Sequence, residues 1–288
     1  MLESLLERFT GFMGASEDYA TSKIAMVGVP MDFTVSFRPG TRMGPRQIRQ
    51  VSYGIEEYSV YLDKDLADKQ YCDLGDINLP FGNVPRCLEL IEQVVRQLLQ
   101  DGKFPLLLGG EHLVTYPIVK AFAAKYQDLV VVHFDAHADL REDYIGETNS
   151  HATVMRKVAQ LIGPSNLYQF GIRSGTKDEF SYARQNTNIF IERVIEPLNE
   201  VIPSLGNRPV YVTLDIDVVD PAYAPGTGTP EAGGCSSREI IQAIHALGQA
   251  NVVGFDLVEV SPMTDQSERT ALLAAKLVRE AILAFPTK

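Results

Sequence analysis

Short apolar runs that alternate with helical patterns limit the fold of this chain more than any other feature of its sequence. Several runs are continuous stretches of Val, Ile and Leu, typical of strands that helices cover on both faces of a parallel sheet. Eight strands are predicted, at residues 23–29, 71–74, 104–110, 129–135, 166–172, 188–191, 209–217 and 252–260. Helical spacing of apolar residues predicts helices at 87–100, 114–126, 153–162, 237–247 and 268–283. The expected fold is α/β, a three-layer α/β/α sandwich with about eight mostly parallel strands.

The alternation continues without a linker, a low-complexity tract or an internal repeat. We therefore expect residues 1–288 to form one domain. Within it, Ser236 and Glu239 have the spacing of a helix N-cap and its partner three residues later, which predicts a helix start at this position.

Charge and composition exclude several classes of partner. The net charge of −11 makes nucleic acid and anionic membranes unsuitable partners, because both require a basic surface. No run approaches the ~18 apolar residues of a membrane span, and the acidic N-terminal residues do not resemble a secretory signal. Three widely spaced cysteines fit reduced thiols. We expect a cytoplasmic protein.

Metal-binding residue types follow three of the predicted strands. Side chains of an extended segment repeat every second residue, so the DAHAD spacing of Asp135, His137 and Asp139 points three polar groups to one side. Asp215 and Asp217 follow another strand with the same spacing, and His112 follows a third. Several acids at the ends of buried strands would repel each other unless a cation paired them. The sequence therefore predicts a metal site where these strands end.

The ligand set indicates the metal and its chemistry. Two histidines and four aspartates, without cysteine, suit Mn²⁺, and two divalent ions would neutralise four carboxylates. Six ligands for two ions imply that some carboxylates bridge them. A water molecule shared by two such ions loses a proton near neutral pH, which indicates a hydrolase.

With these residues identified, the chain resembles the ureohydrolase family, which includes arginases and agmatinases. The resemblance rests on GGEH at 109–112, DAHAD at 135–139, SHATVMRKV at 150–158, LVEVSP at 257–262 and the specific run DIDVVDPAYAPGTGTP at 215–230. It implies two Mn²⁺ ions per subunit, with His112 and Asp139 on one, His137 and Asp217 on the other, and Asp135 and Asp215 bridging. It also implies a catalytic role for Asp135, proton transfer by His151 and guanidinium binding by Glu259.

The segment after Asp139 bears on the choice of guanidine substrate. Arg141 stands where arginases carry an asparagine that holds a carboxylate, while Asp143 and Glu147 suit a cationic amine. Similarity to bacterial agmatinases favours agmatine, cleaved to putrescine and urea in polyamine biosynthesis, with Arg141, Asp143 and Glu147 in substrate binding beside His151 and Glu259. The resemblance also implies a homotrimer or homohexamer.

Three alternatives stay open. Another guanidine could be the substrate, such as guanidinobutyrate, arginine, aminopropylagmatine or guanidine itself. A dimetal phosphoesterase is disfavoured, because the chain lacks the GNHD-type segment of that class. A catalytically silent homologue would be expected to have lost a ligand, and all six are present.

Overall fold

A nine-stranded sheet forms the centre of the computed structural model, which describes residues 2–7 and 10–285. The strand order across the sheet is β1-β5-β2-β6-β11-β10-β7-β8-β9, and every neighbouring pair is parallel except β1 with β5. The strands are β1 (Leu6–Glu7), β2 (Ile24–Val29), β5 (Tyr71–Ile77), β6 (Phe104–Gly109), β7 (Val130–Phe134), β8 (Leu167–Ile172), β9 (Asn188–Ile191), β10 (Val210–Asp215) and β11 (Val252–Val258). The predicted domain of residues 1–288 includes 1, 8, 9 and 286–288, which lie outside the described residues.

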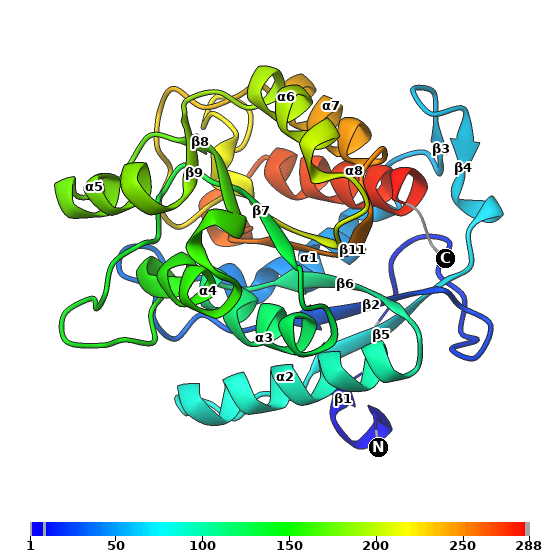
Figure 1. The fold of residues 1–288 in the computed structure, drawn as a ribbon. Coiled ribbons are helices and arrows are strands. Elements are labelled where there is room, and N and C mark those ends of the chain that lie inside the picture. The colour runs from blue at the N-terminus through cyan, green and yellow to red at the C-terminus, as the bar shows by residue number, and fades with distance from the viewer. Residues whose placement is uncertain (1, 8–9, 286–288) are drawn as a thin grey trace.

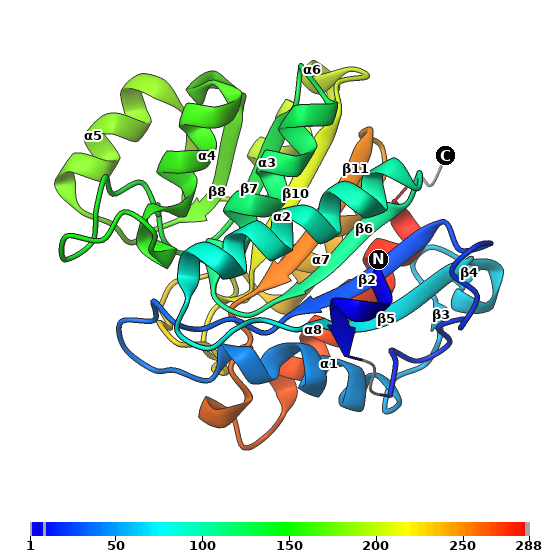
Figure 2. The ribbon, with the colours of Figure 1, turned by 90° about the horizontal axis from the view of Figure 1, so that it is seen from below.

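Helices cover both faces of this sheet (Figures 1 and 2). Neighbouring helices on one face are α1 (Gly44–Ser52), α8 (Arg269–Ala284), α7 (Ser237–Leu247) and α6 (Ile195–Leu205). On the other face they are α2 (Val84–Gln100), α3 (Thr115–Lys125) and α4 (Val154–Ile162), and α5 (Lys177–Asn186) contacts the edge strand β9. Each helical layer shares its own cluster of buried apolar side chains with the sheet. The predicted three-layer α/β/α sandwich is confirmed.

All eight predicted strands are present, and the sheet contains one more. The additional strand, β1, has two residues, too few for an alternating pattern to be visible in the sequence. A separate hairpin of β3 (Tyr58–Ser59) and β4 (Lys64–Asp65) is equally short. Such short strands are defined by pairing with a neighbour, which sequence patterns do not reveal, so β1 was not among the eight predicted strands.

Three α-helices of the described residues were not predicted, because the sequence of each gives only a weak helical signal. Helix α1 begins with Gly-Pro and is mainly polar. Helix α5 buries only Glu179 and Ala183. Helix α6 contains Pro203 in its interior, where proline normally disfavours a helix. In each case packing against the sheet or its neighbours outweighs the weak local signal.

The predicted start of α7 is confirmed and gives a stability prediction. Glu239 N donates to Ser236 Oγ (3.2 Å), and Glu239 Oε2 accepts from Ser236 N (2.8 Å). The substitution Ser236→Ala removes this cap and is expected to lower the free energy of unfolding by about 1 kcal/mol, measured by urea denaturation. Ser237→Ala, one residue later, is the control, and we expect a change within about 0.5 kcal/mol. Equal losses for both variants would contradict the capping assignment.

Two further features bear on the environment of the chain. Within residues 2–7 and 10–285, no helix combines the length and the apolar character needed to cross a membrane. Cys72, Cys87 and Cys235 are all buried, and no disulfide joins them.

Candidate metal centre and active site

The four central strands of the sheet end in acidic and histidine side chains. Strand β6 leads to Glu111 and His112, and its neighbour β11 leads to Glu259. The next two strands, β10 and β7, lead to Asp215, Asp217, Asp135, His137 and Asp139. Carboxyl ends of neighbouring parallel strands lie side by side, and in α/β sheets this edge is where ligands bind. Figure 2 shows the connecting loops gathered at this end of the sheet.

His112 is surrounded by three of the predicted carboxylate ligands. Its Nδ1 lies 3.0 Å from Asp135 Oδ2, 3.3 Å from Asp215 Oδ2 and 3.4 Å from Asp139 Oδ2. All four side chains are buried. The structure thus brings together residues that are more than a hundred positions apart in the sequence.

His137 forms a second group, and Asp135 belongs to both. His137 Nδ1 lies 2.9 Å from Asp217 Oδ2 and 3.4 Å from Asp135 Oδ1. Asp135 therefore directs one carboxylate oxygen to each histidine. All six predicted metal ligands lie in these two adjoining groups.

The arrangement of these atoms fits metal ions. Among the described residues, His112 Nδ1 and Asp217 Oδ2 are buried and have no hydrogen-bond partner, although other polar atoms lie within 3.4 Å of each. Adjacent ligands in an octahedral shell with metal–oxygen distances of about 2.1 Å are about 3 Å apart. Close atoms without hydrogen-bond geometry are therefore what a shared cation requires. The His/Asp clusters could hold metal ions.

Electrostatics support this interpretation. Burial, together with the charge of Asp135, raises the pKa of Asp139 well above its ordinary value. Burial and the charges of Asp217 and Asp135 do the same to the pKa of Asp215. A divalent cation stabilises the charged form of a carboxylate and would reverse both shifts. Added positive charge would therefore stabilise the ionised form of Asp139 and Asp215.

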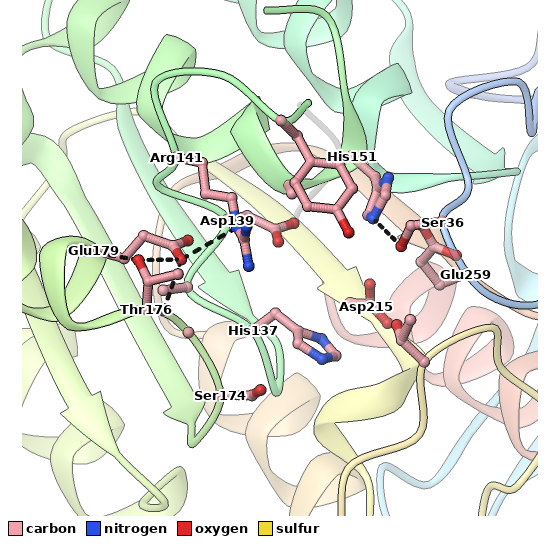
Figure 3. Close-up of a pocket in the computed structure, with 15 residues that line it drawn as sticks. Ser36, His137, Asp139, Arg141, His151, Ser174, Thr176, Glu179, Asp215 and Glu259 are labelled. Carbon is pink, nitrogen blue, oxygen red and sulfur yellow. Dashed lines mark hydrogen bonds and ion pairs between the residues drawn. The ribbon is translucent and has the colours of Figure 1, made fainter. Parts of the chain in front are cut away.

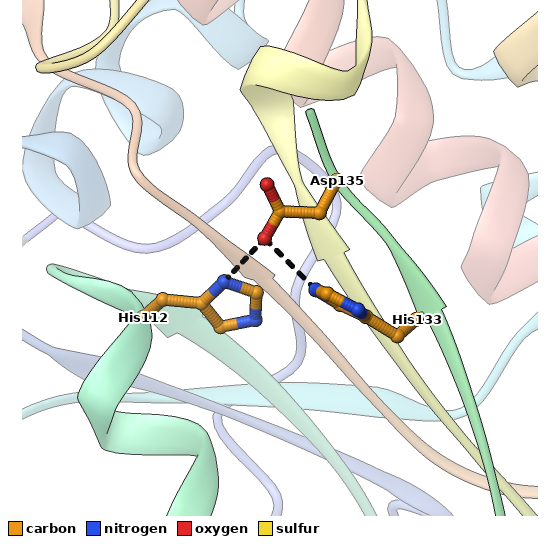
Figure 4. Close-up of side chains that lie close together, drawn as sticks. All are labelled: His112, His133 and Asp135. Atoms are coloured by element: carbon orange, nitrogen blue, oxygen red, sulfur yellow. Dashed lines mark hydrogen bonds and ion pairs between the residues drawn. The ribbon is translucent and has the colours of Figure 1, made fainter. Parts of the chain in front are cut away.

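His133, within strand β7, is a site residue that the sequence analysis missed. Its Nε2 lies 2.8 Å from Asp135 Oδ2, on the side of the carboxylate that faces His112 (Figure 4). Gln169 Nε2 donates both to His133 Nδ1 (3.1 Å) and to the carbonyl of Ala138 (2.9 Å). His133 Nδ1 is therefore an acceptor, so its Nε2 carries the hydrogen and donates to Asp135. The signal available in the sequence was its place two residues before Asp135, on the same side of the strand.

A cavity of about 300 Å³ opens beside the metal-ligand cluster. Figure 3 shows Glu259 and Asp215 on one side of it and Arg141 and Glu179 on the other. Other residues that line the cavity include Ser36, His137, Asp139, Tyr144, His151, Ser174 and Thr176.

His151 begins the 3₁₀ helix His151–Thr153 at the cavity wall, and Ser150 caps this helix. Its backbone N donates to Thr34 Oγ1 (3.0 Å), and its Nε2 lies 3.3 Å from Ser36 Oγ. The ring of Tyr144 meets the imidazole edge-on, with 5.9 Å between ring centroids. Burial lowers the pKa of His151, so its imidazole is neutral at pH 7.

Glu111 is a second residue whose place the sequence analysis did not recognise. Its carboxylate is completely buried and accepts from Phe33 N (3.0 Å), Thr34 N (2.9 Å) and Thr34 Oγ1 (2.5 Å). Thr34 Oγ1 in turn accepts from the backbone of His151. Glu111 therefore holds the segment that contacts His151, a role that only the folded chain reveals.

Glu259 lies at the end of β11 with its carboxylate fixed from one side. Its Oε1 accepts from His112 N (2.7 Å), and the side chain lines the cavity. Burial raises the pKa of Glu259 to about 8, and the positive charge of a bound cation would lower it again and leave the carboxylate ionised. Its φ of 63° is a left-handed conformation that non-glycine residues seldom adopt. The surrounding sheet must therefore stabilise this backbone conformation.

The segment 141–147 contributes one of its three predicted substrate-binding residues to this cavity. Arg141 lines it, with its Nε 3.5 Å from Glu179 Oε2 and its guanidinium over the ring of Tyr144. Asp143 instead accepts from Gly146 N (3.0 Å) in a turn and lines an adjacent cavity. Glu147 is exposed, and its backbone pairs with Tyr144. The structure therefore does not bring Asp143 and Glu147 to the cavity, because the turn directs both outward.

Comparison with known proteins agrees with this geometry. Residues 22–284 match the arginase family. A protein of Bacillus subtilis named agmatinase is 54% identical over 97% of this chain and 98% of its own length, and a guanidinobutyrase of Pseudomonas aeruginosa is 37% identical over 91% and 86%. The crystal structure of an agmatine ureohydrolase from Thermoplasma volcanium is similar with a TM-score of 0.89, at 33% identity, over 98% of this chain and 96% of that one. The chain belongs to the arginase family.

Proposed function

We propose that this enzyme hydrolyses agmatine to putrescine and urea with two Mn²⁺ ions per subunit. The observation that carries the proposal is the convergence of six candidate metal-ligand side chains, five of them buried, beside the cavity that Glu259 lines. Nitrogen and carboxylate donors without a thiolate suit Mn²⁺. The similarity to the agmatinase of Bacillus subtilis over almost the whole of both chains supports the choice of substrate.

The six ligands divide between two ions. His112 and Asp139 would hold one ion, and His137 and Asp217 the other. Asp135 lies between the two histidines, and with Asp215 it would bind both ions. Divalent cations at this place would supply hydroxide near neutral pH, because they lower the pKa of water.

Glu259 would bind the guanidinium group. A carboxylate matches the paired N–H groups of a planar guanidinium, and such charge-assisted hydrogen bonds are about twice as strong as neutral ones. The bond from His112 N to Oε1 fixes the orientation of the carboxylate before substrate arrives. Glu259 would therefore place the guanidinium carbon beside the metal ligands.

His151 would transfer the proton that the leaving amine requires. It is neutral at pH 7 and faces the cavity, so it can accept a proton at Nε2 and pass it to the departing nitrogen. Ser36 and Tyr144 contact its ring and limit its rotation.

Arg141 favours a second candidate within the same family. Its guanidinium lines the cavity opposite Glu259, and a substrate that carries a carboxylate at its far end, such as guanidinobutyrate, could pair with it. Glu179, 3.5 Å from Arg141 Nε, offsets this charge. The cationic amine of agmatine could instead approach Glu179.

Parallel measurement of urea release tests the proposal. The Mn²⁺-loaded protein is incubated with agmatine, guanidinobutyrate, arginine, aminopropylagmatine and guanidine, and the metal-stripped protein serves as the control. We expect agmatine to be hydrolysed with the highest kcat/KM. Preference for guanidinobutyrate would assign the second candidate, and urea from none of them would overturn the proposed reaction.

We further propose that the enzyme acts in the cytoplasm, in polyamine biosynthesis, as a homotrimer or homohexamer. The three buried cysteines, none of them in a disulfide, suit a reducing compartment.

A further inference from the structure

A buried polar network lies behind the metal-ligand cluster, on the side away from the cavity. Its centre is Asp256 on β11, which is fully buried and lies opposite Thr213 of β10 in the register of the two strands. Asp256 Oδ1 accepts from Thr213 Oγ1 (2.5 Å), and Oδ2 accepts from Tyr211 OH (2.5 Å) and Thr115 Oγ1 (3.0 Å). None of these residues lines the cavity.

One member of this network contacts a metal ligand. Thr213 Oγ1 lies 3.0 Å from His112 Nε2, the ring nitrogen that points away from Asp135 (Figure 4). His112 Nδ1, on the other side of the ring, is the buried atom that has no hydrogen-bond partner among the described residues. The ring therefore connects the polar network with the carboxylate cluster.

The direction of these hydrogen bonds follows from the number of hydrogens available. A threonine hydroxyl has one hydrogen, and a carboxylate oxygen at 2.5 Å is the stronger acceptor for it. Thr213 Oγ1 therefore offers a lone pair to His112, so the hydrogen of the imidazole lies on Nε2. A neutral imidazole that carries its hydrogen on Nε2 has its free lone pair on Nδ1, which faces Asp135, Asp139 and Asp215.

We propose that Asp256 and Thr213 are positioning residues that select the tautomer and the ring orientation of His112, so that Nδ1 is available to a metal ion. This inference rests on the proposed metal-binding role of His112, but not on which guanidine is hydrolysed. The partner of the second nitrogen of a metal-binding histidine commonly controls ligand orientation and basicity, and its loss lowers metal affinity by about 10-fold to 100-fold.

The test removes the hydroxyl while preserving the shape of the side chain. In Thr213→Val the imidazole loses its acceptor at Nε2, and the dissociation constant of one of the two Mn²⁺ ions is expected to rise by about 10-fold to 100-fold. Binding is measured by calorimetric titration of the metal-stripped protein and by the Mn²⁺ content after dialysis. If the valine variant does not fold, Thr213→Ala, which also lacks the hydroxyl, takes its place.

Two matched variants separate the proposed role from general packing. Thr213→Ser retains the hydroxyl, and its Mn²⁺ affinity is expected to equal that of the wild-type protein. Tyr211→Phe removes a hydroxyl from the same Asp256 carboxylate without contacting His112, and its Mn²⁺ affinity is expected to stay within about threefold of wild type.

Each outcome has a separate meaning. Unchanged affinity in the hydroxyl-free variants, or an equal loss in Tyr211→Phe, would overturn the inference. If the wild-type protein binds no Mn²⁺, the proposed function itself fails. Wild-type binding of two ions, with selective loss at position 213, would support both.

Discussion

Asp135→Asn is expected to lower kcat for agmatine by at least about 10³-fold, because activation by metal ions is worth several kcal/mol of transition-state stabilisation. Asp135 contacts both His112 and His137, and so it belongs to both groups of predicted ligands. An asparagine removes its charge, and its amide NH₂ would face either the donor Nε2 of His133 or the cluster, so the group could not satisfy both sides. Initial rates and the Mn²⁺ content per chain after dialysis measure the effect, and both are expected to fall.

His151→Ala is the comparison for this experiment. It removes an imidazole that lines the cavity but is not among the predicted metal ligands, so we expect lower turnover with the Mn²⁺ content unchanged. An Asp135→Asn protein that retains full activity after its metal has been removed would refute the proposed mechanism. Loss of Mn²⁺ from His151→Ala would indicate that His151 supports the metal site instead of transferring a proton.

Glu259→Gln is expected to lower kcat/KM on the order of 10²-fold to 10³-fold, because losing one charged partner of a buried hydrogen-bonded pair costs about 2–5 kcal/mol. The amide oxygen of glutamine can still accept from His112 N, so the local backbone contact is retained and the lost quantity is the charge. Steady-state kinetics with agmatine, together with circular dichroism and Mn²⁺ content, separate this effect from misfolding.

Glu259→Asp serves as the control, since it retains the charge but withdraws the carboxylate from the cavity. If kcat/KM falls less in Glu259→Asp than in Glu259→Gln, the charge is the main contribution of this side chain. If Glu259→Gln bound agmatine and turned it over as the wild-type protein does, guanidinium binding would have to be assigned elsewhere in the cavity.

The layers of the fold could be predicted because each major strand has a local signature. Continuous apolar runs such as residues 104–110 and 129–135 are visible without any knowledge of their partners. Strand β1 and helix α6 lack such signatures: the first is defined by antiparallel pairing with β5, and the second contains Pro203. Local patterns therefore predicted the parallel core but not the elements that depend on tertiary contacts.

The candidate site shows the same difference between features with a local sequence pattern and features that depend on tertiary contacts. The six predicted metal ligands follow strand ends, five of them at alternate positions, so their types and spacing were informative in the sequence. Glu111, His133 and Asp256 were not recognised, since their roles depend on which residues lie opposite them across strands or loops. Asp143 and Glu147 are the opposite case. Their residue type and their place after Asp139 suggested substrate binding, but in the structure both face away from the cavity.

The strand order also determines when the metal site can form during synthesis of the chain. Strands β2, β5 and β6 make one group of neighbours and β7, β8 and β9 another, and in the sheet of the described residues β10 and β11 lie between the two groups. His112 belongs to the first group and Asp135 to the second. A chain that ends before residue 210 therefore lacks the strands that place His112 beside Asp135. Strands β10 and β11, the last two in the sequence, complete both the sheet and the set of predicted ligands, so a bound metal ion would stabilise only the fully assembled fold.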